Sequence, residues 1–101
     1  MAELNTILRI KHGGSPIEDV DVICEFGQKD TNSQGQITYI TDEDIQRPLL
    51  VSMRHTLWGN AVVMAVILFE AGNTYELDIP LDPELPDSIT PGLHSLRFKK
   101  L

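Results

Sequence analysis

The sequence has a single cysteine, Cys24, and no apolar run longer than the nine residues from Ala61 to Phe69. One cysteine excludes an internal disulfide, so the core alone must hold the fold. Nine apolar residues are too few for a transmembrane helix, which needs about 20. No charged segment followed by an apolar one opens the chain, so we expect no signal peptide. The compartment stays open: extracellular for a domain of a surface protein, otherwise cytoplasmic.

Basic residues are also few. Eight lysines and arginines stand against fifteen acids, which gives a net charge of -7. Such a chain repels the phosphate backbone of nucleic acids unless its cations cluster. The nearest approach to a cluster is Arg97, Lys99 and Lys100, which we expect to be solvated at the end of a strand. Nucleic acid is therefore not an expected partner, and insertion into a membrane is not expected either.

Residues that carry out chemistry are scattered. The three histidines, His12, His55 and His94, show none of the short spacings typical of metal sites. We expect His55 to be a core or rim histidine bonded to backbone. Cys24 shares the inward face of a strand with Val20, where a thiol behaves as a small hydrophobic group. The sequence therefore predicts no enzyme activity, no metal and no cofactor.

One segment is similar to the start of a calcium loop. Asp30, Asn32 and Gln34 are spaced like the first ligands, and Gly35 follows them. The twelfth position of the loop would be Thr41, where a bidentate glutamate is needed, and flanking helices are missing. We therefore expect an ordinary hairpin turn.

Alternation of apolar and polar residues dominates the chain. With 101 residues, 42% of them apolar, one domain spanning 1–101 with one core is expected. A period of two, with β-branched residues between clusters of Gly, Asn, Asp and Pro, predicts strands rather than helices. Strands are expected over residues 6–12, 20–26, 36–39, 49–57, 61–69, 74–81 and 95–101.

The connections agree with an all-β fold. Thr41 to Asp44 carries a weak signal for one helical turn, residues 28–34 predict a polar turn, and the proline-rich segment 82–92 predicts a long surface connection. About seven strands at regular spacing are typical of a sandwich. The expected fold class is an immunoglobulin-like or prealbumin-like antiparallel β-sandwich.

A turn pattern between residues 6 and 40 looks familiar. Gly14-x-Pro16-Ile17 runs into Val20-x-Val22, and Thr31-Asn32-x-x-Gly35 leads into the next strand. This pattern resembles the carboxypeptidase-regulatory-like and Cna-B-like domains of the prealbumin (transthyretin-like) group. Members of that group are mostly accessory modules that stabilise a neighbouring enzyme, form stalks, or bind proteins or sugars. The resemblance therefore implies a binding or structural role.

Two reactive members of this group fit the chain poorly. Cna-B-like domains often carry an isopeptide bond between a lysine on the first strand and an asparagine on the last. Lys11 would be the lysine, but it lies on a polar face and residues 95–101 contain no asparagine. The related hydroxyisourate hydrolases end in a Tyr-Arg-Gly-Ser type of tail, whereas this chain ends in Phe98-Lys99-Lys100-Leu101. Neither activity is expected.

An exposed apolar face is the strongest functional signal. Alternation from Leu49 to Leu57 places Leu50, Arg54 and Trp58 on the solvent side, and residues 61–69 present apolar groups on both faces. Large apolar patches on a soluble domain commonly mark an interface. The candidate interaction residues are Leu50, Arg54, His55, Trp58, Val63, Ile67 and Phe69.

These residues lead to two hypotheses. The first is a non-catalytic module that binds a protein partner or forms a homodimer through this face. The alternative is a carbohydrate or small-ligand module, in which Trp58 or Tyr39 stacks on a sugar and His55 or Arg54 donates hydrogen bonds. A competing possibility for the patch is that the segment 82–92 covers it.

Overall fold

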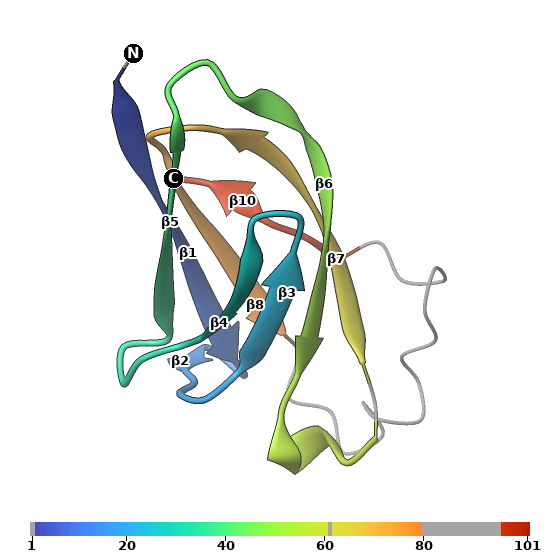
Figure 1. The fold of residues 1–101 in the computed structure, drawn as a ribbon. Helices are drawn as coiled ribbons and strands as arrows, with labels where there is room; N and C mark the ends of the chain where they lie inside the picture. Colours follow the sequence, from blue (N-terminus) through green and yellow to red (C-terminus); the bar gives the residue numbers. More distant parts are fainter. Residues whose placement is uncertain (1, 61, 80–95) are drawn as a thin grey trace.

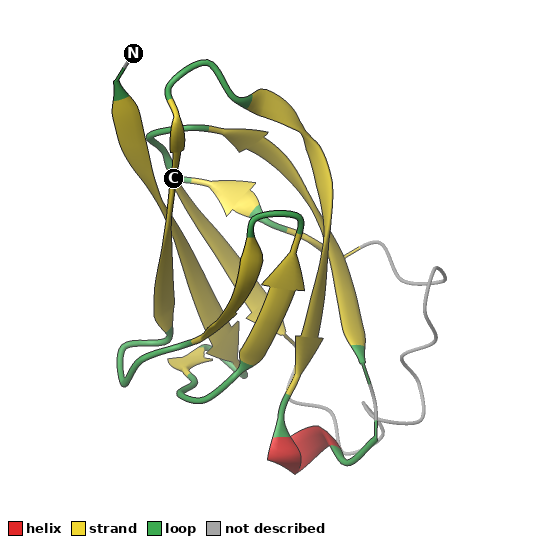
Figure 2. Ribbon diagram, in the orientation of Figure 1, coloured by secondary structure: helices red, strands yellow, loops and turns green. Residues whose placement is uncertain are grey.

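Two β-sheets packed face to face make up the fold (Figures 1 and 2). The computed structural model describes residues 2–60, 62–79 and 96–101. Sheet A contains β1 (Glu3–His12), β2 (Ser15–Pro16), β5 (Gln36–Asp42), β8 (Thr74–Ile79) and β10 (Lys99–Lys100). Sheet B contains β3 (Asp21–Cys24), β4 (Gly27–Asp30), β6 (Gln46–Arg54), β7 (Val63–Glu70) and β9 (Leu96–Arg97). A short 3₁₀ turn, η1 (Thr56–Trp58), follows β6.

This architecture confirms the predicted all-β sandwich but corrects one detail. The strand orders are β10-β8-β1-β2, with β5 also on β1, and β4-β3-β6-β7-β9. Most neighbouring strands are antiparallel, as predicted, but β1 pairs with β8 in parallel and β7 pairs with β9 in parallel. Side chains alternate in the same way in parallel and antiparallel strands, so a period of two does not reveal strand direction.

The core consists of the inward residues that alternation predicted. Leu8 and Ile10 of β1 are buried and Arg9 between them is exposed; Tyr75, Leu77 and Ile79 of β8 repeat this pattern. The other sheet supplies the facing layer of the core, which includes Val22, Leu49, Val51, Met53, Val63, Ala65, Ile67 and Phe69. Because both layers meet in one cluster, the described residues share a single core.

Two local predictions were wrong. Residues 28–30 of the predicted polar turn 28–34 belong instead to strand β4, which pairs with β3. All four residues of β4 are exposed, so the segment lacks the apolar alternation that predicts a strand. No helical turn forms at Thr41, because β5 continues to Asp42 and a simple turn follows, in which Ile45 N–H donates to Asp42 C=O.

The last described segment connects the two sheets. A single final strand was predicted, but β9 pairs with β7 in sheet B and β10 pairs with β8 in sheet A. Between them Phe98 is buried and its N–H donates to the carbonyl of Val66 at 3.0 Å. Residues 96–100 therefore cross from one layer to the other and close one side of the sandwich (Figure 1).

A row of four aromatic rings crosses the interior. Phe26 lies between Tyr39 and Phe69, with centroids 6.2 and 4.9 Å away, and Phe69 stacks on Tyr75 at 6.5 Å. Both tyrosines come from sheet A and reach the backbone of sheet B. Tyr39 donates to the carbonyl of Gly27 at 3.0 Å, and Tyr75 donates to the carbonyl of Leu68 at 2.9 Å. The tyrosine at each end of the row therefore forms a hydrogen bond between the two sheets.

The turn pattern identified in the sequence forms one structural unit. Buried Thr31 accepts a hydrogen bond from Val20 N–H at 3.0 Å and donates to the Ile17 carbonyl at 2.7 Å. Asn32 Oδ1 accepts the N–H groups of residues 34 and 36. Gly35 C=O accepts the N–H of Ile10 at 2.7 Å. The motif therefore ties the end of β1 to the two loops before and after β3 and β4.

Replacing Thr31 with valine is expected to lower the free energy of unfolding by about 2–3 kcal/mol. Valine has the same shape, but it leaves the Val20 N–H and the Ile17 carbonyl without this partner. Chemical denaturation of both proteins measures the difference. Thr31→Ser keeps the hydroxyl and is the control; an equal loss in both variants would contradict the hydrogen-bonding role.

Candidate interaction surface

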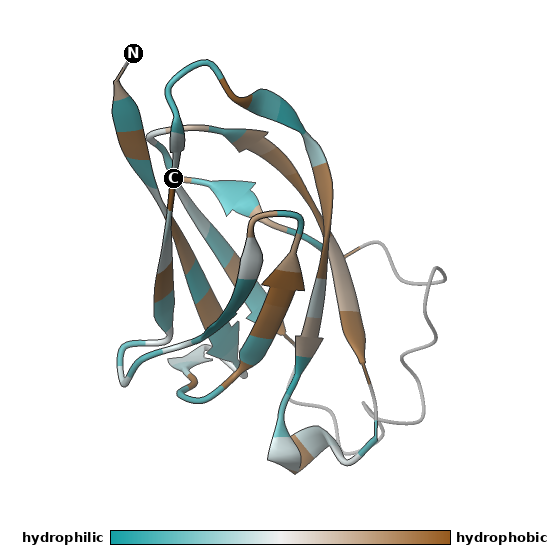
Figure 3. Ribbon diagram, viewed as in Figure 1, coloured by the Kyte–Doolittle hydropathy of each residue, from teal (hydrophilic) through white to brown (hydrophobic). Residues whose placement is uncertain are grey.

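The outward side of sheet B carries a strip of apolar side chains. The strand register places Pro48 beside Leu68, Leu50 beside Val66, and Ser52 between Met64 and Ile23. In Figure 3, brown colouring dominates β3 and long stretches of β6 and β7. We call this strip the β3–β6–β7 face; it comprises the polar residue Ser52 and six apolar residues, Ile23, Pro48, Leu50, Met64, Val66 and Leu68.

The two outer faces of the sandwich differ in chemistry. Leu50 and Leu68 are 59% and 65% exposed, and Ile23 and Val66 are also among the exposed large hydrophobic residues. The outward face of sheet A instead carries residues such as Arg9 and the ion pair between Lys11 and Glu76, whose charged atoms are 2.7 Å apart. Apart from Ile40 on β5, which is 62% exposed, the outer face of sheet A is mainly polar, as is typical of a sandwich, whereas sheet B exposes a cluster of four large hydrophobic residues.

Part of the predicted interaction set lies on this face, and part does not. Leu50 and Arg54 are exposed, as predicted. Val63, Ile67 and Phe69 are fully buried, so their proposed place on the surface was wrong. Because residues 61–69 are apolar at every position, the sequence did not show which alternate set faces inward. The pairing of Leu49 with Ile67 decides it and leaves the even-numbered residues of β7 outside.

Trp58 was also predicted on the wrong side. It is 1% exposed, whereas Leu57, predicted to face inward, is 69% exposed. Strand β6 ends at Arg54 and the 3₁₀ turn η1 begins at Thr56, so the alternation no longer holds. The Trp58 ring packs against those of His12 and His55, and its Nε1 has no hydrogen-bond partner among the described residues.

His55 has the structural role expected from the sequence. Its Nδ1 accepts the N–H of Leu57 at 3.0 Å, which caps η1, and its Nε2 lies 2.9 Å from the carbonyl of Glu18. An accepting Nδ1 places the ring proton on Nε2. Both ring nitrogens are therefore occupied by backbone groups.

The hydroxyl of Tyr39 is a hydrogen-bond donor with a raised pKa. Burial raises the pKa of this phenol above its ordinary value, and neighbouring Cys24 and Asp21 add to the shift. The raised pKa extends the pH range over which the hydroxyl keeps its proton to more alkaline values. Tyr39 therefore donates steadily to the Gly27 carbonyl, and Cys24, which is half-buried and unpaired, packs against the core as predicted.

A groove runs along the side of the β3–β6–β7 face. Its volume is about 400 Å³, and Val66, Leu68 and Phe98 form its apolar lining together with Tyr75. The charged side chains of Glu70, Arg97 and Lys100 also line it. We call it the seam groove, because it lies between β7 and the segment that crosses to sheet A. A second hollow of about 340 Å³, on the other side of Leu68, is lined by Arg47 and Pro48 among others.

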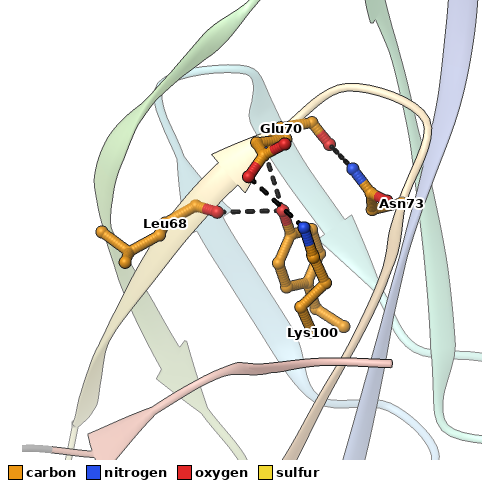
Figure 4. Close-up of polar contacts among 5 residues, drawn as sticks. Leu68, Glu70, Asn73 and Lys100 are labelled. Atoms are coloured by element: carbon orange, nitrogen blue, oxygen red, sulfur yellow. Dashed lines mark hydrogen bonds and ion pairs between the residues drawn. The ribbon is translucent and has the colours of Figure 1, made fainter.

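Tyr75, which lines the seam groove, occupies backbone hydrogen-bonding groups at the edge of β7. Tyr75 Oη donates to Leu68 C=O and accepts the N–H of Glu70 at 2.8 Å, as Figure 4 shows. Asn73 Nδ2 donates a hydrogen bond to the carbonyl of Glu70 at 3.1 Å, and Lys100 Nζ lies 3.5 Å from the Glu70 carboxylate. Tyr75 thus takes the hydrogen-bonding positions that a further strand would use.

The other sequence features considered above form no binding site among the described residues. The described residues contain no group of three histidine, cysteine or acidic side chains that would hold a metal ion. The segment similar to a calcium loop forms a hairpin turn, with Asn32 Oδ1 turned towards backbone N–H groups. His94 and the predicted connection 82–92 lie outside the described residues. None of the described helical segments is long and apolar enough to cross a membrane.

Comparison with known proteins adds no identification. No known protein family matches the chain. No curated protein matches it either.

Proposed function

We propose that this protein is a non-catalytic β-sandwich module that binds a protein partner, or a second copy of itself, through the β3–β6–β7 face. The contrast between the two outer faces supports this proposal. Covering exposed apolar surface contributes about 25 cal/mol per Å². The strip around Leu50 and Leu68 therefore provides a larger driving force for association than the outer face of sheet A, where Ile40 is the exposed large hydrophobic residue among those described.

We also propose membership of the carboxypeptidase-regulatory-like or Cna-B-like group. The support is that Thr31, Asn32 and Gly35, which carry the resemblance, act together as one hydrogen-bonded unit. An isopeptide bond is not part of this proposal. Lys11 is engaged by Glu76 on the outer face of sheet A, and residues 96–101 contain no asparagine.

The burial of two aromatic rings favours protein binding over sugar binding. Stacking on a sugar needs an exposed ring face, and both Trp58 and Tyr39 are almost completely buried. His55, the other residue considered for sugar contacts, has both ring nitrogens engaged by backbone. Arg54 alone of the four stays exposed.

Replacing Leu50 and Leu68 together with threonine is expected to abolish association while leaving stability nearly unchanged. Threonine keeps the preference for strands but removes most of the exposed apolar surface. Sedimentation velocity over a range of concentrations measures self-association. Affinity capture with quantitative mass spectrometry, compared between variants, measures binding to other proteins.

A matched variant makes this test specific. Ile40 and Leu57 are similarly exposed but lie outside the β3–β6–β7 face. Ile40→Thr with Leu57→Thr removes comparable apolar surface at the same net charge and should bind like the wild type. Equal behaviour of the two double variants in both measurements would rule out this face as the binding site.

A further inference from the structure

We propose that the seam groove binds a partner segment in which an apolar side chain stands next to a carboxylate. This inference rests on the proposed function, because it names the chemistry of the segment bound beside the β3–β6–β7 face. The groove combines an apolar lining with two cations, Arg97 and Lys100. Ligand sites typically show this combination of apolar walls and a few placed polar groups.

The size and walls of the groove leave room for an apolar side chain together with a neighbouring carboxylate. A volume of about 400 Å³ lies within the range of small-molecule sites. Val66 and Leu68 form one wall and also belong to the β3–β6–β7 face, so an occupant of the groove would be continuous with a partner on that face. Phe98 supplies apolar surface from the segment that crosses between the sheets.

The charges beside the groove oppose the charge of the whole protein. The net charge of the chain is -7, yet residues 96–101 contain three cations and no acid. Arg97 makes no ion pair with any described residue, and Lys100 makes only the exposed 3.5 Å contact with Glu70. Among the described residues, a carboxylate beside these two side chains would therefore compete only with Glu70.

The closed edge of β7 determines how the segment is recognised. Tyr75 occupies Leu68 C=O and Glu70 N–H, so a partner strand finds these two backbone groups already bonded. Addition of a strand to this edge is disfavoured. Recognition must instead come from side chains: the apolar group enters between Leu68 and Phe98, and the carboxylate meets Arg97 and Lys100.

N-acetylleucine is the simplest probe, because it joins an apolar side chain to a carboxylate, and N-acetylleucinamide is its uncharged control. We expect N-acetylleucine to shift the backbone NMR signals of Val66, Leu68 and Phe98 and to bind with a Kd on the order of millimolar. The amide should bind about two- to five-fold more weakly. Equal binding of the two probes, or no shifts at the groove, would overturn the proposal.

Three charge variants test whether binding of N-acetylleucine depends on the charges at the seam groove. Arg97→Gln should weaken binding of N-acetylleucine about two- to five-fold, and Glu70→Gln should strengthen it by a similar factor. Arg9→Gln makes the same charge change on the outer face of sheet A and should have no effect. Equal weakening by Arg97→Gln and Arg9→Gln would refute the local site. A failure here leaves the Leu50 and Leu68 experiment unaffected, so the two proposals fail separately.

Discussion

Replacing Gly35 with alanine is expected to lower the free energy of unfolding by about 3 kcal/mol or more. The backbone φ of Gly35 is +72°, and a Cβ atom there would lie 2.4 Å from the carbonyl oxygen of Ile10. The same Cβ would stand 3.1 Å from the N atom of Ile17. Because these neighbours are backbone atoms, the motif itself would have to shift and lose the bond from Ile10 N–H to Gly35 C=O.

A substitution at Gly14 separates the cost of the positive φ from the cost of steric crowding. Its φ is also positive, at +84°, but no atom lies within 4 Å of a Cβ built there. Gly14→Ala should therefore cost only the left-handed conformation, about 1 kcal/mol. Chemical denaturation of the three proteins measures both changes. Similar losses in the two variants would show that crowding at Gly35 is unimportant and would weaken the structural account of the motif.

Trp58→Ala is expected to cost about 3–5 kcal/mol, as removal of a fully buried large side chain does. The indole fills the space beside His12 and His55 at the end of the sandwich. The free energy of unfolding of globular domains is typically about 5–15 kcal/mol. A loss of this size is therefore a large fraction of the total stability. Thermal and denaturant unfolding measure it directly.

The fluorescence of Trp58 provides an independent measurement, because it is the only tryptophan in the chain. We expect blue-shifted emission and little quenching by iodide in the folded protein. Trp58→Phe should cost clearly less than Trp58→Ala, since it keeps an aromatic ring and removes an N–H that has no partner among the described residues. A change in stability below about 0.5 kcal/mol for Trp58→Ala would instead place the ring at the surface.

Alternation was a reliable guide wherever one face of a strand is apolar and the other polar. It identified the inward residues of β1 and β8 because a polar neighbour separates each pair of them. It did not find β4, whose four residues are all exposed and which forms through backbone pairing with β3. It also carried no information on direction, so the parallel pairing of β1 with β8 emerged only in the structure.

The candidate site was predictable in kind but only partly in its residues. The sequence indicated an apolar outer face and correctly placed Leu50 on it. Ile67 and Leu68 are equally apolar, so only their pairing with β6 reveals which one faces solvent. The seam groove had no signal in the sequence, because it combines the end of β7 with residues about 30 positions away. Such a site exists only after the two segments have been brought together.

The aromatic row gives the β3–β6–β7 face a property beyond its composition. Tyr39 donates to β4 and Tyr75 donates to β7, so one layer cannot slide over the other without breaking these partly buried hydrogen bonds. If this face binds a partner, as proposed above, its strands would already be held in place by these bonds. Binding would then cost little conformational entropy, and more of the free energy of desolvation would be retained as affinity.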